Sequence, residues 1–204
     1  MTTARMIRYA AWAAVVLLVI AVAAVSYTSW RSQEGIPLAP VASIGGPFTL
    51  VNGKGETVTR EDLKGKPTLM FFGFTYCPDV CPTTLFEMQG WIEALGDDAD
   101  KLNYAFVSVD PERDTPDVMS DYVAAFDDRI TPLTGTPEQI QDVIKAYRVY
   151  ARRVELDDGD YTMDHTAGVY MMTADHQFVG TISYGETHDA ALQKIRDLIS
   201  ANAA

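Results

Sequence analysis

The apolar and polar residues of the chain separate into one continuous apolar stretch near the N-terminus and a longer region of short, alternating segments. Residues 9–30 carry no charged side chain, and Arg5 and Arg8 precede them. A helix of about 20 apolar residues spans the hydrocarbon core of a bilayer, and basic residues are enriched on its cytoplasmic side. The pattern therefore predicts a cytoplasmic tail over residues 1–8, a transmembrane anchor over residues 9–30 and a C-terminal region outside the cytoplasm.

A cleaved signal peptide is the alternative interpretation of this stretch, because Ala21-Val22-Ala23 resembles a processing site. The apolar run is long and contains no Pro or Gly before that site, which favours a retained anchor. The absence of an Arg- and Ser-rich transit peptide favours a bacterial chain over a mitochondrial one. We therefore expect a single-pass protein of the inner membrane with its C-terminal domain in the periplasm.

The region after the anchor predicts one α/β domain. Residues 31–45 mix Pro, Gly and polar residues, as is typical of a linker, so we place the domain at residues 46–204. An unbroken apolar run over residues 68–74 favours a central strand that is buried on both faces. The other predicted elements are a hairpin over 47–59, a helix over 83–95, a strand over 103–110, helices over 116–126 and 137–147, a hairpin that pairs 169–172 with 178–183, and a helix from Thr187.

Strands that alternate with helices and end in a hairpin and a helix indicate a central mixed sheet flanked by helices. A cysteine pair lies where the first buried strand runs into its helix, and this placement is, by analogy, typical of the thioredoxin-like group. We therefore predict an α/β, thioredoxin-like fold that follows an N-terminal transmembrane helix.

The charge of the chain narrows the list of partners. The formal net charge is −12 at pH 7, all 28 acidic residues follow Trp30, and two of the 16 basic residues precede it. A strongly acidic domain repels the phosphate backbone of nucleic acids. We therefore expect no nucleic-acid partner.

The two cysteines lie in one short segment, Cys77-Pro78-Asp79-Val80-Cys81-Pro82. Pro is accepted in the first turn of a helix and not in its interior, so Pro82 places Cys81 near a helix start and Cys77 in the preceding loop. Side chains four apart on a helix lie about 5–6 Å from each other, so the sulfurs can form a disulfide or bind one metal ion. Backbone N–H groups and the helix dipole stabilise thiolates there, and we expect lowered pKa values for both cysteines.

The chain contains three histidines that could complete a metal site. Thiolates select copper(I), zinc or iron–sulfur clusters, and copper(I) is satisfied by two or three ligands, whereas structural zinc sites usually take four. His176 falls on a predicted hairpin turn and His188 begins the last predicted helix, so we expect both to be exposed to solvent. His165 precedes the strand at 167–172, and in a thioredoxin-like fold the loop that enters this strand faces the cysteine turn. His165 is therefore the candidate third ligand.

Three segments of the chain resemble the Sco/SenC family of copper chaperones. They are FFGFTYCPDVCP at 71–82, VSVDPERDTP at 107–116, and Asp164-His165 followed by Tyr170. The resemblance extends from about Gly46 to Leu198, and the combination of motifs is specific, whereas C-x-x-x-C alone is weak. It implies a thioredoxin-like fold with one copper(I) or copper(II) ion per domain, bound by Cys77, Cys81 and His165.

The resemblance also implies a function and supporting residues. Proteins of this family help to build the dinuclear copper site (CuA) of cytochrome c oxidase subunit II, so that subunit or another copper-receiving protein is the expected partner. Asp79 and Asp164 are candidates for orienting the histidine, and Met171 and Met172 are interpreted as strand core. The segment 110–116 shares the family pattern, and we expect it to shape the rim of the copper loop without supplying a ligand.

Two other functions stay open from the sequence. The cysteine pair could act as a thiol–disulfide oxidoreductase that keeps the cysteines of a recipient protein reduced, although its spacing differs from the C-x-x-C of thioredoxins. A peroxiredoxin-type peroxidase needs an Arg beside its reactive cysteine, and no Arg flanks Cys77 in the sequence. We therefore predict a copper-binding assembly protein, not an enzyme. In the alternative function, thiol–disulfide exchange, Cys77 and Cys81 would be the redox-active pair.

Overall fold

The structure is a computed structural model that describes residues 9, 12–13, 16–23, 44–157 and 159–202. The chain divides into two compact units, Met1–Ala42 and Ser43–Ala204, and the second unit contains the folded domain. In the described part of the chain, no helix has both the length and the apolar character needed to cross a bilayer. The tail predicted at 1–8, half of the predicted anchor and nearly all of the predicted linker lie outside the described residues, so these boundaries stay predictions.

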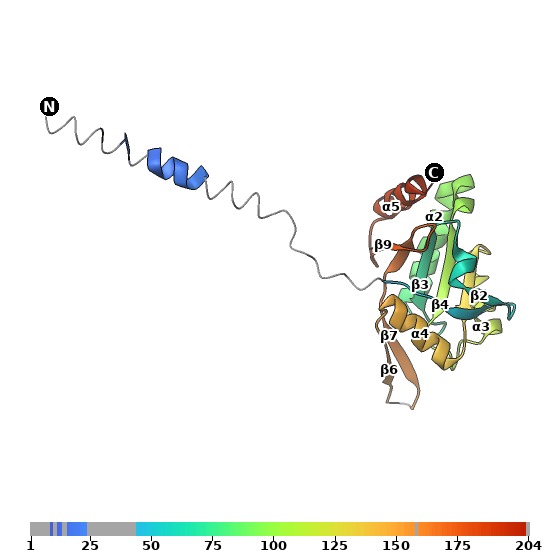
Figure 1. Ribbon diagram of the computed structural model, residues 1–204. Coiled ribbons are helices and arrows are strands. Elements are labelled where there is room, and N and C mark those ends of the chain that lie inside the picture. Colours follow the sequence, from blue (N-terminus) through green and yellow to red (C-terminus); the bar gives the residue numbers. More distant parts are fainter. Residues whose placement is uncertain (1–8, 10–11, 14–15, 24–43, 158, 203–204) are drawn as a thin grey trace. The chain divides into compact units, whose positions relative to one another are not determined.

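A seven-stranded mixed sheet forms the centre of the domain (Figure 1), with the strand order β2-β1-β5-β4-β3-β8-β9. Strands β3, β4 and β5 run parallel to one another, and every other neighbouring pair is antiparallel. The sheet consists of β1 (Thr49–Asn52), β2 (Thr57–Thr59), β3 (Thr68–Gly73), β4 (Asn103–Ser108), β5 (Ile130–Thr134), β8 (Val169–Met172) and β9 (Phe178–Ile182). This arrangement confirms the predicted mixed sheet and the alternation of strands with helices.

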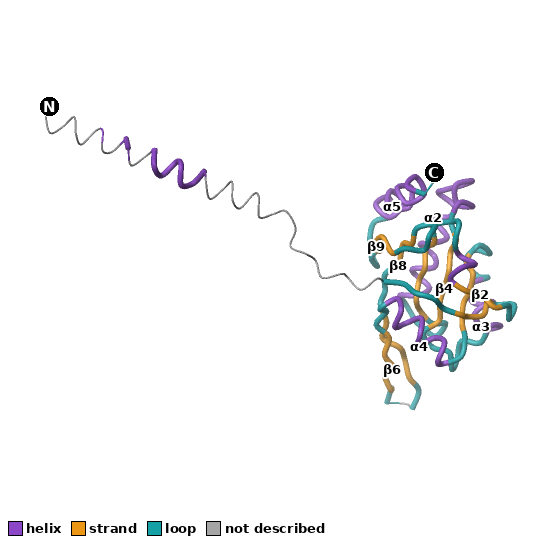
Figure 2. The backbone as a smooth tube through the Cα atoms, in the orientation of Figure 1, coloured by secondary structure: helices purple, strands orange, loops and turns teal. Residues whose placement is uncertain are grey.

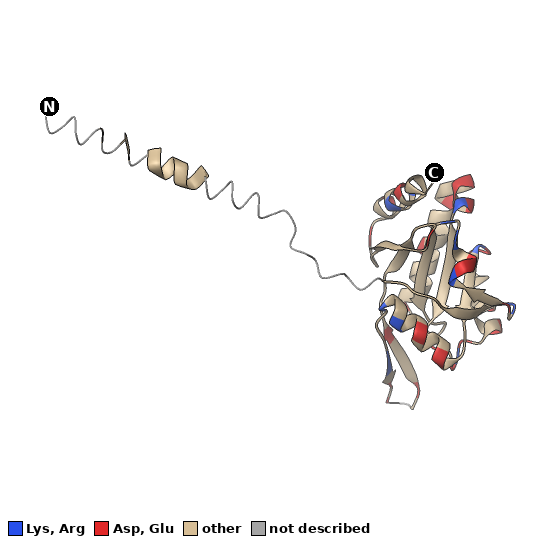
Figure 3. Cartoon of the chain, viewed as in Figure 1, with Lys and Arg blue, Asp and Glu red and all other residues tan. Residues whose placement is uncertain are grey.

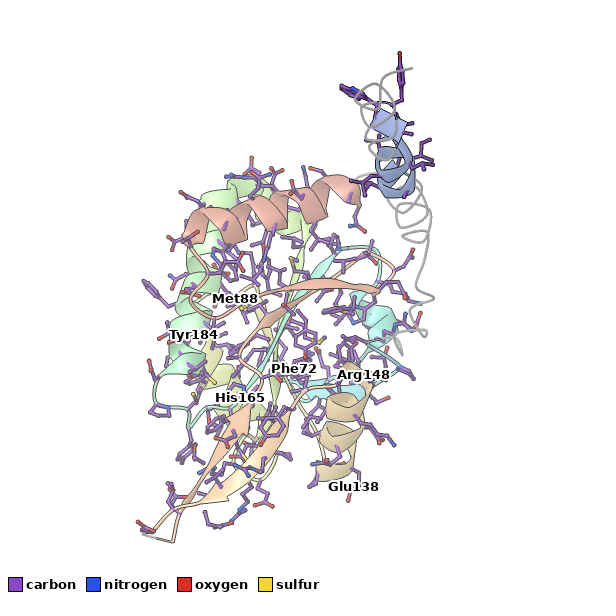
Figure 4. All side chains as sticks on the ribbon, turned by 90° about the vertical axis from the view of Figure 1, so that its left-hand side faces the viewer. Phe72, Met88, Glu138, Arg148, His165 and Tyr184 are labelled. Atoms are coloured by element: carbon purple, nitrogen blue, oxygen red, sulfur yellow. The ribbon has the colours of Figure 1, made fainter. Side chains whose placement is uncertain are left out.

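Helices cover both faces of this sheet, with α2 and α5 on one face and α4 on the other (Figure 4). The helices are α2 (Val80–Leu95), α3 (Pro116–Val123), α4 (Pro137–Tyr147) and α5 (His188–Ala201), and two short 3-10 helices are η1 (Arg60–Leu63) and η2 (Gly96–Lys101). Successive strand residues point to opposite faces. Accordingly, Phe71 of β3 stacks on Phe106 of β4, whereas Phe72 contacts Tyr147 of α4. All six residues of β3 are buried, as its unbroken apolar run predicts.

The predicted helix starts are confirmed by their caps. The Thr115, Thr136 and Thr187 side chains each accept a hydrogen bond from a backbone N–H in the first turn of α3, α4 and α5. Helix α2 begins at Val80, three residues earlier than predicted. Its first turn therefore contains both Cys81 and Pro82, consistent with the tolerance of Pro at such positions.

Three strands are missing from the sequence prediction. Strand β5 contains Pro132, which interrupts the β pattern of its sequence. Strands β6 (Ala151–Glu155) and β7 (Tyr161–His165) form a separate two-stranded hairpin outside the main sheet (Figure 2). Exposed charged residues occupy much of β6, so this hairpin shows no apolar run from which to predict it.

The prediction that His176 is exposed to solvent is wrong. His176 lies on the predicted β8–β9 turn, with a left-handed φ of 59°, but its side chain is 1% exposed and its Nε2 lies 2.6 Å from the Tyr147 hydroxyl. The turn folds back over the end of α4 and buries the ring. The predicted exposure of His188 is confirmed, as is the burial of Met171 and Met172.

Charged side chains are spread over the surface of the domain, and Figure 3 shows acidic and basic residues interspersed along the helices and loops. Several form local ion pairs, such as Lys64 with Glu61 and Lys101 with Asp98. Exposed pairs of this kind contribute at most about 1 kcal/mol each. The buried apolar core, not the surface charge, therefore stabilises the domain.

Candidate metal centre

The cysteine pair lies where β3 runs into α2. The chain turns after Phe74, whose carbonyl accepts a hydrogen bond from the Cys77 N–H at 3.3 Å, and the Cys81 N–H points to the Cys77 sulfur at 3.3 Å. Cys77 is half-buried and Cys81 is fully buried, and their thiols are not bonded to each other. The Cys77 sulfur is therefore accessible to solvent, whereas the Cys81 sulfur is buried in the first turn of α2.

His165 brings an imidazole to this pair from the end of the β6–β7 hairpin (Figure 4). Its Nδ1 lies 2.9 Å from the Thr166 carbonyl oxygen, and its Nε2 lies 3.3 Å from the Cys81 sulfur. An Nδ1–H that donates to a carbonyl leaves the Nε2 lone pair free for a ligand. The predicted position opposite the cysteine turn is confirmed, but His165 ends a strand and does not lie in a loop as predicted.

Two aromatic side chains, Phe71 in β3 and Phe74 directly after it, hold this ring in place. The Phe71 ring contacts the imidazole edge-on at 6.1 Å, and the Phe74 ring is perpendicular to it at 5.7 Å. Such edge-to-face pairs fix orientation in addition to burying area. The imidazole is therefore directed towards the sulfurs by packing as well as by its hydrogen bond.

The three candidate ligand atoms, Cys77 Sγ, Cys81 Sγ and one His165 ring nitrogen, lie within 4.8 Å of one another. An ion bound at about 2.0–2.3 Å by three ligands separates the ligand atoms by roughly 3.5–4 Å, so small side-chain rotations suffice to close the group. A hollow of about 240 Å³ adjoins it, lined among others by Cys77, His165 and Met163. The donor set of two sulfurs and one imidazole nitrogen fits a soft metal ion.

The two sulfurs differ strongly in acidity. The hydrogen bond from the Cys81 thiol, helped by the backbone N–H groups of Asp79 and Cys81, lowers the pKa of Cys77 to about 3. The same contact with the Cys77 thiolate, together with burial, raises the pKa of Cys81. The expectation that both pKa values are lowered is therefore wrong for Cys81. Two thiolates this close together in a buried site would repel each other, so the pair carries one negative charge and the second thiol stays protonated.

A glycine in β3 makes room for the buried sulfur. A Cβ on Gly73 would lie 2.7 Å from Cys81 Sγ and 2.8 Å from the Phe106 ring. Both distances are far inside van der Waals contact, and neither neighbour is free to move, since both are fully buried. The absence of a side chain at this position therefore allows Cys81 to sit against the sheet.

We expect Gly73→Ala to destabilise the domain by about 1–3 kcal/mol, the usual cost of overpacking a core, and to displace the Cys81 sulfur. Urea unfolding followed by circular dichroism measures the change. Gly90→Ala in α2 is the matched control, since its new Cβ would meet His188 at an ordinary 3.6 Å and Ala favours a helix interior. A Gly73→Ala protein as stable as the Gly90→Ala protein would contradict this account.

The segment 110–116 was expected only to shape the rim of the copper loop. In the structure it supports the cysteine loop through a buried carboxylate. Asp114 is fully buried, and its carboxylate accepts hydrogen bonds from the Thr75 hydroxyl and the Ser108 hydroxyl, each at 2.6 Å, and from the Thr75 N–H. Burial raises the pKa of Asp114, and these donors oppose that rise. Thr75 lies two residues before Cys77, so the carboxylate ties the loop to β4. The shared family pattern at 107–116 was the available signal for this role.

Neither acidic residue predicted to orient His165 does so through its carboxylate. Asp164 is exposed and pairs with Arg152 across the hairpin at 2.9 Å. Asp79 is also exposed, and it contributes its backbone N–H to Cys77. The Thr166 carbonyl has the orienting role instead. Because every residue has a backbone carbonyl, this partner could not be predicted from residue types in the sequence.

The strand order, the cysteine pair in the first turn of α2 and the histidine opposite define a thioredoxin-like domain with a Cys–Cys–His group. A family model described as SCO1/SenC matches residues 37–200. The chain belongs to the SCO1/SenC family, and the thioredoxin-like fold predicted from the cysteine placement is confirmed.

Relatives and solved structures agree with this assignment. The chain is 42% identical over 154 residues to "Protein SCO1 homolog 1, mitochondrial" of Arabidopsis thaliana, covering 75% of this chain and 46% of that protein. It is 40% identical over 131 residues to "Protein SenC" of Rhodobacter capsulatus, covering 64% and 59%. The structure of Bradyrhizobium japonicum ScoI with copper bound matches with a TM-score of 0.72 and 51% identity, over 76% of this chain and 99% of that one. The chain spans about half the length of the first curated relatives that it matches.

Proposed function

We propose that this protein is a copper chaperone that binds one copper ion through Cys77, Cys81 and His165. The observation that carries the proposal is the convergence of two sulfurs and one imidazole nitrogen within 4.8 Å. Thiolate ligands select copper(I) among the common metal ions, and the added imidazole also suits copper(II). Relatives with copper bound, from Bradyrhizobium japonicum and from yeast, support this choice of metal.

The copper is cargo, and the site is built to release it. Cys77 and His165 are partly exposed, whereas Cys81 is buried beneath them. An incoming thiolate of a recipient can therefore reach the metal from the Cys77 side and replace the ligands one at a time. The recipient we propose is cytochrome c oxidase subunit II at its dinuclear copper site, a choice supported by a structural relative described as a member of "the Sco family of cytochrome c oxidase assembly proteins".

Anaerobic copper(I) titration of the full chain in detergent tests the proposal. We expect one copper per chain, and we expect Cys77→Ala and His165→Ala to lose stoichiometric binding because each removes one ligand. His188→Ala is the matched control, since His188 is an exposed histidine on α5, and it should bind copper as the unchanged protein does. Binding of one copper by the His165→Ala protein with unchanged affinity would reject the assigned ligand set.

Thiol–disulfide exchange is a second candidate function, favoured by one observation. The pKa of Cys77 is lowered to about 3 and its sulfur lies within 4.8 Å of that of Cys81, so a thiolate nucleophile and a resolving thiol are both present. Reduction of a disulfide-bonded peptide with the recipient's cysteine pair measures this activity. A rate that survives His165→Ala would favour exchange, whereas a rate that depends on bound copper would favour copper delivery.

We further propose that residues 9–30 anchor the chain in the inner membrane with the domain in the periplasm. The uncharged stretch and the preceding Arg5 and Arg8 support this placement. Alkaline extraction of membranes, followed by protease treatment of spheroplasts, measures both attachment and side. We expect the protein to resist extraction and its domain to be digested from outside. A protein released by alkali and lacking residues 1–23 would indicate a cleaved signal peptide instead.

A further inference from the structure

The position of His165 depends on a hairpin that the main sheet does not hold. Strands β6 and β7 pair only with each other among the described strands, and the hairpin projects below the sheet in the view of Figure 2. An isolated two-stranded hairpin is at best marginally stable in water. Side-chain contacts with the rest of the domain must therefore fix the distance between His165 and the cysteines.

Arg113, from the segment that follows β4, makes the densest set of such contacts. Its Nη1 donates to the Tyr161 carbonyl oxygen at 2.9 Å and lies 3.4 Å from the Asp160 carboxylate. Its guanidinium carbon lies 3.6 Å above the Tyr161 ring. Tyr161 and His165 are four apart on β7, so both side chains point to the same side of the strand. Arg113 thus holds the inward face of the strand that presents the imidazole.

The same guanidinium also contacts the cysteine loop. Its carbon lies 4.6 Å above the ring of Tyr76, the residue directly before Cys77. Its Nε donates to the Asp110 carboxylate at 2.6 Å, and the other Asp110 oxygen accepts the Tyr161 hydroxyl at 2.8 Å. Asp110 is 3% exposed and the Arg113 side chain 15% exposed, so the ion pair between them is shielded from solvent and salt.

We infer that Arg113 is a positioning residue of the copper site, which holds the hairpin of His165 and the loop of Cys77 in register with each other before metal arrives. The predicted effect of Arg113 on copper binding rests on the proposed function, whereas the contacts of Arg113 are seen in the structure whether or not copper binds. Arg is required because one planar group must donate in two directions and stack on aromatic rings at the same time. A Lys ammonium is a point charge that provides neither. Asp110 orients the guanidinium, and Tyr161 is the contact through which the hairpin is held.

Arg113→Lys, which keeps the charge and loses the planar fork, tests the inference with two measurements. The first is hydrogen exchange of the copper-free protein. We expect the amides of residues 161–166 to exchange about tenfold faster while those of β3 and β4 stay protected, as for local opening. The second is competition for copper(I) against a chelator, in which we expect affinity to fall by about 10- to 100-fold, the usual loss when a residue that supports a metal ligand is changed.

Two further variants keep the outcome interpretable. Arg129→Lys is the matched control, since Arg129 also donates two hydrogen bonds to one carboxylate, that of Asp127, outside the metal centre; it should change neither measurement. Tyr161→Phe removes only the hydroxyl bond to Asp110 and should give a smaller change of the same kind. Copper affinity and hairpin exchange that both stay at their unchanged values in Arg113→Lys would overturn the inference, as would faster exchange with unchanged affinity. Failure of the unchanged protein to bind copper would instead overturn the proposed function. In that case, faster exchange confined to the hairpin of the Arg113→Lys protein would still show that Arg113 holds the hairpin.

Discussion

Asp114→Leu is expected to destabilise the domain by about 3 kcal/mol or more. The substitution removes the carboxylate that accepts from the Thr75 hydroxyl, the Thr75 N–H and the Ser108 hydroxyl. Each buried donor left without an acceptor costs about 1–3 kcal/mol, and Leu cannot replace any of these contacts. Urea unfolding measures the loss as a lower midpoint with an unchanged slope. The cysteine loop is tied to the sheet through Thr75, so we also expect its amides to exchange faster.

Two comparisons separate the hydrogen bonds from general effects of substitution. Asp114→Asn keeps one acceptor oxygen and should lose clearly less stability than Asp114→Leu. Asp121→Leu replaces an exposed aspartate on α3 and should change stability by no more than about 0.5 kcal/mol. Equal losses in Asp114→Leu and Asp121→Leu would show that the buried network does not stabilise the fold.

His176 is expected to make the stability of the domain depend on pH between about 6.5 and 4. Burial, with smaller contributions from Arg60 and Lys64, lowers the pKa of His176 from 6.5 to about 4 in the folded state. The unfolded chain therefore takes up a proton in this range that the folded domain does not, and stability falls as the pH falls through it. A difference of about 2.5 pKa units corresponds to roughly 3 kcal/mol in full, present above pH 6.5 and lost by pH 4.

The contribution of His176 is isolated by comparing how steeply the free energy of unfolding falls with pH in different variants. His176→Asn removes the titrating group and retains a residue that tolerates the left-handed backbone at this turn, where φ is 59°. Its free energy of unfolding, measured by urea at several pH values from 7 to 4, should fall less steeply than that of the unchanged protein. His188→Asn, at an exposed position, should leave the slope unchanged. If His176→Asn and the unchanged protein lose stability in parallel, the buried ring is not the source of the pH dependence.

The main sheet was predictable where local pattern and burial agree. The run at 68–74 predicts β3 because a strand buried on both faces needs continuous apolar residues, and the Thr-Pro pairs predict α3 and α4 because caps act locally. Strand β5 was missed because Pro132 interrupts its pattern and because its pairing with β4 and β1 is a long-range property. The buried state of His176 was missed for a similar reason, since a turn residue becomes buried only when α4 packs against it.

The three side chains that converge at the candidate site could be named from the sequence, whereas the residues that support them could not. Cys77, Cys81 and His165 could be named from a motif combination and the family resemblance. The Gly73 position, the Asp114 network and the Thr166 carbonyl depend on distances across the fold, which no spacing in the sequence encodes. The opposite pKa shifts of the two cysteines follow from one sulfur donating to the other at close range. A helix-terminus argument treats each cysteine separately and therefore misses that difference.

The detached hairpin leaves each of its two strands with one edge that no described strand pairs with, and the edge of β6 is strongly charged. Strand β6 pairs with β7 on one side, and no described strand pairs with its other side. An unpaired edge can recruit a strand from another molecule, and charged side chains are a common defence against such association. Arg152, Arg153 and Glu155 lie on β6 and are exposed. These charges make the free edge of β6 a poor template for a strand of another molecule, so the hairpin that presents the imidazole is protected from association along that edge.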